Sequence, residues 1–229
     1  PILSLYDGKS KKPSESSIRK FDILIVDIQD VGLRFYTYYI SMVRLMDACS
    51  EYNRKVLILD RPNPNGHYVD GPILDMKYKS GVGGLPIPIV HGMTLGELAL
   101  MVNGEGWLPS SRTCDVTVIP CKNYTHQTMY RLPIPPSPNL PNMKAIYLYP
   151  STCFFEATPV SLGRGTSLPF QVYGHPNMTG YNYSFTPRSV PGAKTPTQLT
   201  KLCHGVNLSN LSDEDIWKKG VNLTYIIDA

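Results

Sequence analysis

Three acidic residues follow apolar segments, in positions where a carboxyl group can do acid–base chemistry. Asp27 and Asp30 come after an apolar run near the start of the chain, and Glu156 comes directly after Cys153-Phe154-Phe155. Burial disfavours the charged form of a carboxyl group, so partial burial of Glu156 would raise its pKa and suit a general acid. For Asp30 the alternative is structural, because it can cap the helix expected after it.

Three arginines are candidates for holding an anionic substrate group, because the planar guanidinium matches a carboxylate. They are Arg34, Arg61 and Arg164. Arg164 lies between two glycines, in a turn that can expose its side chain, and its alternative role is an internal salt bridge with Glu156. Arg61 and Asn63 together can bind a ligand through directional hydrogen-bond donors.

Structural explanations compete at two further places. An Asp60–Arg61 ion pair can brace the proline-rich loop that follows it. His91 ends an apolar run, where a histidine serves either as a proton carrier or as a satisfied structural residue. Glu97 is best explained as the partner of Thr94 in a helix capping box.

The elements that must position these residues are read from hydrophobic periodicity. Almost continuous apolar runs over 21–27 and 55–60 predict buried parallel strands, and helical spacing over 34–53 predicts the helix between them. A helix after Thr94 and a third strand over 115–120 extend this βαβ unit. We therefore predict a Rossmann-like α/β fold, with an open, mostly parallel sheet and helices on both faces.

The candidate residues fall outside the carboxyl ends of the strands, where such a sheet binds its ligands, or in the second domain. A rigid proline-rich connector over 132–141 predicts a domain boundary. We assign residues 1–140 to the Rossmann-like domain and residues 141–229 to a smaller α+β domain. In the latter, Ser212 is the expected N-cap of a last helix that continues toward the C-terminus.

Composition excludes several classes of protein. With 42% hydrophobic residues the chain is not disordered, although it contains 21 prolines and 18 glycines. No apolar run is long enough to span a membrane, and a net charge of +4 from scattered residues does not indicate nucleic-acid binding. The five cysteines lack metal-ligand spacing, so we predict no metal and mostly free buried thiols, with one disulfide as the alternative.

The motifs taken together resemble one family, the NamZ-type exo-β-N-acetylmuramidases of bacterial cell-wall recycling. The resemblance extends over nearly the whole chain. It is carried by Asp27-Ile28-Gln29-Asp30-Val31-Gly32 with Arg34-Phe35-Tyr36-Thr37-Tyr38, Asp60-Arg61-Pro62-Asn63-Pro64, His91-Gly92-Met93-Thr94-Leu95-Gly96-Glu97-Leu98, Pro136-Ser137-Pro138-Asn139, Glu156-Ala157-Thr158, Gly163-Arg164-Gly165-Thr166 and Cys203-His204-Gly205-Val206.

The resemblance implies a glycoside hydrolase with its active site in a cleft between two domains. Such an enzyme releases terminal N-acetylmuramic acid from the non-reducing ends of peptidoglycan fragments, without a metal or nucleotide cofactor. Its expected partners are peptidoglycan-derived saccharides or muropeptides, and its expected location is periplasmic or secreted. No signal peptide is visible in Pro1–Tyr6.

One departure from the family pattern concerns the first residues. Family members carry a Gly-Pro-Glu-His-Gly loop upstream of the segment that matches Pro1–Tyr6, and its glutamate is a prime catalytic candidate. This loop is absent from the sequence, and family chains also continue past the point that matches Ala229. We therefore expect the chain to be an internal piece of the enzyme.

These observations give a leading hypothesis and two alternatives. In the leading one, Glu156 is an acid/base candidate, Asp27 or Asp30 orients or stabilises charge, and His91 lies in the site wall. The lactyl carboxylate would be held by Arg34, Arg61 or Arg164, with Tyr36 and Asn63 as further substrate contacts. One alternative is a non-catalytic muropeptide- or sugar-binding module. The other is a nucleotide-binding α/β domain, which the absent glycine fingerprint disfavours.

Overall fold

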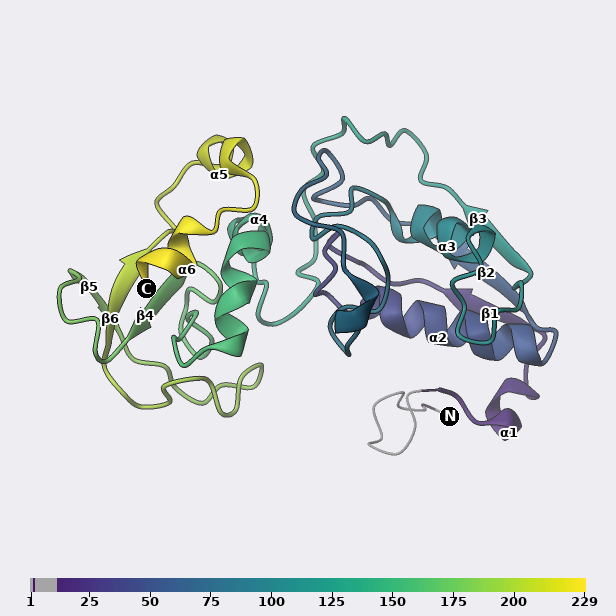
Figure 1. Ribbon diagram of the computed structural model, residues 1–229, viewed down its shortest axis with the longest axis horizontal. Coiled ribbons are helices and arrows are strands. Elements are labelled where there is room, and N and C mark those ends of the chain that lie inside the picture. The colour runs from purple at the N-terminus through teal and green to yellow at the C-terminus, as the bar shows by residue number, and fades with distance from the viewer. Residues whose placement is uncertain (1, 3–11) are drawn as a thin grey trace. The chain divides into compact units, whose positions relative to one another are not determined.

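The computed structural model describes residue 2 and residues 12–229, and these form two compact units, Pro1–Tyr130 and Arg131–Ala229 (Figure 1). Residues 1 and 3–11, which include most of the segment inspected for a signal peptide, lie outside the described residues. Unit 1 contains α1 (Glu15–Ile18), β1 (Ile23–Val26), α2 (Tyr38–Glu51), β2 (Lys55–Leu59), the 3-10 helix η1 (Met76–Tyr78), α3 (Leu95–Gly104) and β3 (Val116–Ile119).

The sheet of unit 1 is parallel throughout and has the strand order β1-β2-β3. In register, Leu24 lies opposite Val56, and Ile58 lies opposite Val118. Helix α2 connects β1 to β2, and α3 lies in the connection from β2 to β3. The predicted βαβ arrangement and its parallel sheet are confirmed.

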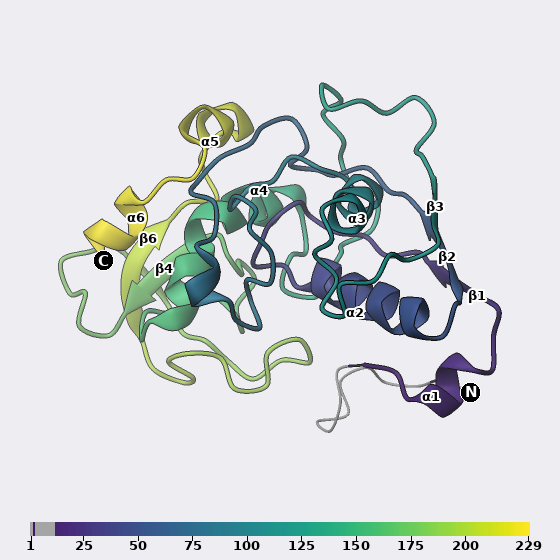
Figure 2. The same ribbon diagram turned by 45° about the vertical axis from the view of Figure 1, so that its right-hand side comes forward.

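Helices α2 and α3 pack against one face of this sheet (Figure 2). Val56 and Ile58 point into the core with Met42 and Leu98, and each of these side chains is at most 1% exposed. Alternate strand residues face the other way, as the burial pattern of β2 shows.

The opposite face of the sheet differs from expectation. Ile23, Ile25 and Ile119 are 53%, 59% and 48% exposed, so among the described residues the helices cover one face and not both. A continuous apolar run shows that both faces of a strand are apolar, but it does not say which segment covers each of them. The apolar pattern therefore predicted the strands correctly, and the described residues place α2 and α3 on one face of the sheet.

Unit 2 contains a smaller antiparallel sheet with the strand order β4-β6-β5. Helix α4 begins after Asn142, whose side chain accepts a hydrogen bond from Ala145 N, and packs with η2, α5 and α6. The predicted smaller α+β unit is confirmed. Its elements are α4 (Met143–Thr152), η2 (Cys153–Ala157), β4 (Val172–His175), β5 (Tyr183–Phe185), β6 (Cys203–Asn207), α5 (Asp213–Lys219) and α6 (Thr224–Asp228).

Two local predictions in unit 2 have different outcomes. Ser212 caps α5 as predicted, by accepting a hydrogen bond from Asp215 N at 3.0 Å. The helix does not continue toward the C-terminus, because Gly220 adopts a left-handed φ of 57° and ends it. All five cysteines of the chain are free, and Cys121 is the one that is not buried.

Candidate functional site

The loops that follow β1 and β2 lie side by side, as their place at one edge of the sheet predicts. The side-chain amide of Gln29 donates to Asp30 O at 2.7 Å and to Pro62 O at 2.9 Å, which ties the two loops together. Asn65 Nδ2 donates to Val31 O at 2.8 Å and adds a second cross-link.

Asn63 supports this loop cluster from inside. Its side chain donates through Nδ2 to Met93 O at 2.9 Å and accepts from Asn65 N at 2.8 Å, and the residue is 3% exposed. Gly32 lies against it with φ +76°, and a Cβ there would be 2.2 Å from Asn63 Nδ2. Asn63, predicted to contact substrate, is therefore engaged within the protein.

Asp30 is buried beside the same loop. The residue is 6% exposed, and Oδ1 accepts from Gly32 N at 2.8 Å, whereas the buried Oδ2 has no hydrogen-bond partner among the described residues. Burial raises its pKa from 3.8 to about 7, against the opposing effect of backbone N–H groups. Through Oδ1, Asp30 therefore holds the backbone of the loop that follows β1.

His91 is also buried, at 4% exposure. Its Nδ1 accepts from Met93 N at 3.2 Å, so the proton of the neutral ring lies on Nε2, which has no partner among the described residues. Burial lowers its pKa to about 4. The ring is therefore neutral at neutral pH.

Asp27 and Arg61 form an exposed ion pair between the loops that follow β1 and β2. Arg61 Nε lies 2.6 Å from Asp27 Oδ1, and each side chain is nearly half exposed. The hydrogen bond from Arg61 lowers the pKa of Asp27, so this carboxylate is ionised at neutral pH.

The predicted Asp60–Arg61 side-chain pair is absent, because Asp60 serves the N-terminus of α3. It accepts from Thr94 Oγ1 at 2.6 Å and from Gly96 N at 2.8 Å. A helix N-terminus attracts a carboxylate, and here that attraction determines the partner. Thr94 and Glu97 form the predicted capping box.

Arg34 and Tyr36 lie within the fold. The guanidinium of Arg34 donates through Nη1 to the carbonyls of Pro72 and Ile87, at 2.8 and 2.7 Å, and the residue is 7% exposed. The ring of Tyr36 lies 4.5 Å from that of Tyr38, and Tyr36 is 8% exposed. These contacts favour a structural role for both residues.

Glu156 and Arg164 of unit 2 form an ion pair, as the structural alternative proposed. Glu156 belongs to η2, and about a third of each side chain is exposed, so Glu156 is partly buried. Cys153 and Phe155, which precede it, are buried. The guanidinium of Arg164 also lies over the ring of Phe170, 5.2 Å from its centroid.

This ion pair lines a pocket of about 340 Å³. Its volume falls in the roughly 300–1,000 Å³ range of small-molecule sites. No sequence pattern predicted that the segment 193–197 lines this pocket, because the segment is distant from Glu156 in sequence. The polar lining residues are Glu156, Ser161, Arg164, Lys194, Thr195 and Thr197.

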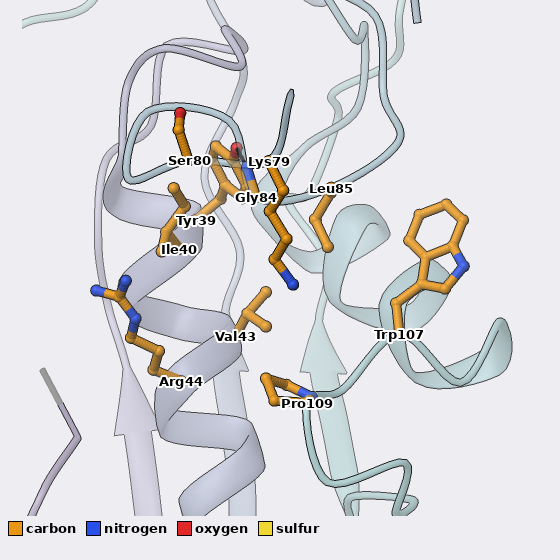
Figure 3. Close-up of a pocket in the computed structure, with 10 residues that line it drawn as sticks. All are labelled: Tyr39, Ile40, Val43, Arg44, Lys79, Ser80, Gly84, Leu85, Trp107 and Pro109. Atoms are coloured by element: carbon orange, nitrogen blue, oxygen red, sulfur yellow. Dashed lines mark hydrogen bonds between the residues drawn. The ribbon is translucent and has the colours of Figure 1, made fainter. Parts of the chain in front are cut away.

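A second pocket, in unit 1, has a volume of about 90 Å³ and is shown in Figure 3. Ile40 and Val43 of α2 form one wall, Leu85 and Trp107 contribute further apolar groups, and the side chain of Lys79 extends toward Val43. It is smaller than a typical ligand site, and none of the predicted site residues lines it.

The fold, the polar loops that follow β1 and β2, and the pocket of unit 2 together define the class of protein. It is a two-unit α/β protein with a polar pocket large enough for a sugar. The chain belongs to the NamZ family of exo-β-N-acetylmuramidases. Residues 1–144 match the family's N-terminal domain and residues 147–226 match its C-terminal domain.

Three similar proteins illustrate this membership. The peptidoglycan beta-N-acetylmuramidase NamZ of Bacillus subtilis (strain 168) is 42% identical over 224 residues, which cover 91% of this chain and 53% of that protein. The chain therefore spans about half the length of this curated relative.

Two solved DUF1343 family proteins of Bacteroides fragilis NCTC 9343 are also similar. BF0379 is 86% identical, with a TM-score of 0.93 over 98% of this chain and 65% of that one. BF0371 is 30% identical, with a TM-score of 0.76 over 95% and 62%.

Among the residues that the structure describes, no group of three or more His, Cys, Asp or Glu side chains could hold a metal ion. No helix of the described chain is long and apolar enough to cross a membrane.

Proposed function

We propose that this chain is part of an exo-acting β-N-acetylmuramidase that releases terminal N-acetylmuramic acid from the non-reducing ends of peptidoglycan fragments. Family membership and the 42% identity to a peptidoglycan β-N-acetylmuramidase support this proposal. Such fragments arise in the cell wall, so we further propose a periplasmic or exported location.

The pocket of unit 2 is the main structural observation that supports the proposal, because it indicates roles for individual residues. Glu156, a predicted catalytic residue, lines this pocket, and Arg164 lies beside it. We assign Glu156 to acid/base or electrostatic work at the glycosidic bond, which commonly needs carboxyl groups near the scissile oxygen. We assign Arg164 to the lactyl carboxylate, which its planar donors match.

Unit 1 supplies a second exposed carboxylate. Asp27 is ionised and held by Arg61, so it suits stabilisation of the positive charge that develops on the sugar ring. Asp30 and His91 are covered, so we assign them to positioning the loops after β1 and β2.

The test is release of 4-nitrophenol from 4-nitrophenyl β-N-acetylmuramide, with BF0379 assayed in parallel as a longer relative. Glu156→Gln should reduce kcat/KM by about 100-fold or more, because acid/base groups contribute roughly 10²–10⁴-fold. Glu214→Gln is the matched control, since Glu214 is an exposed, ion-paired glutamate of α5. Unchanged turnover in Glu156→Gln would remove Glu156 from the catalytic residues.

If the protein is a non-catalytic sugar-binding module, the same measurements give a different result. Calorimetry would then detect binding of N-acetylmuramic acid, while neither this chain nor BF0379 would hydrolyse the chromogenic substrate. That combination would replace the hydrolase proposal by the binding proposal.

A further inference from the structure

The charges around the pocket of unit 2 are unequal. Two cations, Arg164 and Lys194, and one acid, Glu156, line it. Arg164 is already paired with Glu156, whereas Lys194 is exposed and has no ion pair among the described residues. The pocket thus has an uncompensated positive charge, which favours an anionic ligand.

The wall that carries Lys194 is held in place by hydrogen bonds. Val190 and Ala193 exchange backbone hydrogen bonds of 3.1 and 2.9 Å, on the N-terminal side of Lys194. On its C-terminal side, Gln198 Nε2 donates to Pro159 O at 2.8 Å. A fixed wall reduces the entropy lost when a ligand is bound.

The facing wall is held to this segment at Gly165. Its carbonyl accepts from Arg188 N at 2.9 Å, and its φ is +81°. A Cβ at this position would be 2.3 Å from Arg188 O and 2.7 Å from Pro196 Cγ, so the two walls can approach only at a glycine. This contact keeps Lys194 and Arg164 on the lining of one pocket.

N-acetylmuramic acid differs from N-acetylglucosamine by the lactyl group on O3, which carries a carboxylate. In a pocket with Glu156 and Arg164 alone, that carboxylate would compete with Glu156 for one guanidinium. Lys194 supplies the second cation, so both carboxylates can be compensated. The hydroxyls of Thr195 and Thr197 remain for the neutral groups of the sugar.

We propose that Lys194, acting with Arg164, is a specificity-determining residue that selects sugars bearing a carboxylate over their neutral counterparts. This inference rests on the proposed function and identifies the pocket of unit 2 as the subsite for the acidic sugar. Lys194 holds the substrate carboxylate and takes no part in bond cleavage.

The experiment compares kcat/KM for the 4-nitrophenyl β-glycosides of N-acetylmuramic acid and N-acetylglucosamine. Lys194→Met should lower kcat/KM for the muramide about 10- to 100-fold, the range of a charged hydrogen bond of roughly 1.5–3 kcal/mol. The loss should lie mainly in KM, and kcat/KM for the glucosaminide should stay within twofold. Lys194→Arg should restore most of the preference, and Lys201→Met, which removes an exposed lysine of the same unit, should have no effect.

Two outcomes overturn the inference while leaving the hydrolase proposal intact. One is an equal loss for both substrates in Lys194→Met, which indicates a structural role. The other is a Lys194→Met variant whose kcat/KM for both substrates is the same as that of the wild type. If the wild-type chain and BF0379 hydrolyse neither substrate, the proposed function fails. Calorimetry with free N-acetylmuramic acid and free N-acetylglucosamine then tests the carboxylate site by binding alone. A preference for muramic acid that disappears in Lys194→Met supports the carboxylate site, and equal binding of both sugars refutes it.

Discussion

Replacing Asp30 by asparagine should make the stability of unit 1 less dependent on pH. Asparagine has nearly the same shape and retains an oxygen that can accept from Gly32 N, but it cannot ionise. The pKa of Asp30 is about 7 in the folded protein, against an ordinary value of 3.8. The folded state therefore binds the proton more tightly than the unfolded chain does.

The sign and size of the effect follow from this difference. The stabilising contribution of the Asp30 proton is complete below pH 3.8 and is lost as the pH rises through about 7. With about 1.4 kcal/mol for each tenfold change in proton affinity, the contribution falls by roughly 3 kcal/mol between pH 5 and pH 8. Asp30→Asn lacks this loss, so its stability relative to the wild type should rise by the same amount.

Urea denaturation at pH 5, 6, 7 and 8 would measure this difference. Trp107 and Trp217 are the two tryptophans of the chain, one in each unit, so a Trp217→Phe background lets Trp107 fluorescence report unit 1. Any pH-independent cost of burying the asparagine NH₂ group cancels when the difference is compared between pH values. Asp22→Asn, at a side chain that is 95% exposed, is the matched control.

A stability difference between Asp30→Asn and the wild type that stays constant from pH 5 to pH 8 would refute the reasoning. It would mean that Asp30 is hydrated and ionises normally in the folded protein. A fall of the difference with rising pH would mean that the ionised carboxylate is stabilised by its neighbours, contrary to the burial described above.

Three further substitutions test other parts of the fold. Thr94→Val removes the side chain that caps α3 and should lower the free energy of unfolding by about 1–2 kcal/mol in urea. Gly165→Ala should destabilise unit 2 by about 2 kcal/mol or more, because the backbone is left-handed there and Arg188 O is too close for a Cβ. Gly180→Ala is the control, since a Cβ there meets open space and should be tolerated. Thermal unfolding of both variants is followed by circular dichroism. Ile25→Thr should reduce the fluorescence of a bound apolar dye, since Ile25 is 59% exposed, and an unchanged signal would show that the dye binds elsewhere.

Local sequence signals predicted much of unit 1. The apolar runs identified β1, β2 and β3, and the Thr94–Glu97 spacing identified the start of α3, because each depends on neighbours within a few residues. The resemblance to the NamZ family carried the functional assignment, which hydrophobic periodicity cannot supply.

Partner choice in the candidate site was predicted less well. Asp60 binds the start of α3 and not the side chain of Arg61. This outcome depends on a segment that is distant in sequence. For the same reason Lys194 had no signal, since it reaches the pocket only through the packing of the segment 193–197.

The cross-links among the loops of unit 1 limit how those loops can be exchanged between proteins. Gln29 and Asn65 bind carbonyls in the neighbouring loop, and Asn63 fills the space beside Gly32 while holding Met93 O. A chimera that imports one of these loops alone would lose partners of its polar groups, and any residue other than glycine at position 32 would clash with Asn63. We therefore expect the segments 27–34, 60–66 and 91–93 to tolerate exchange better together than singly.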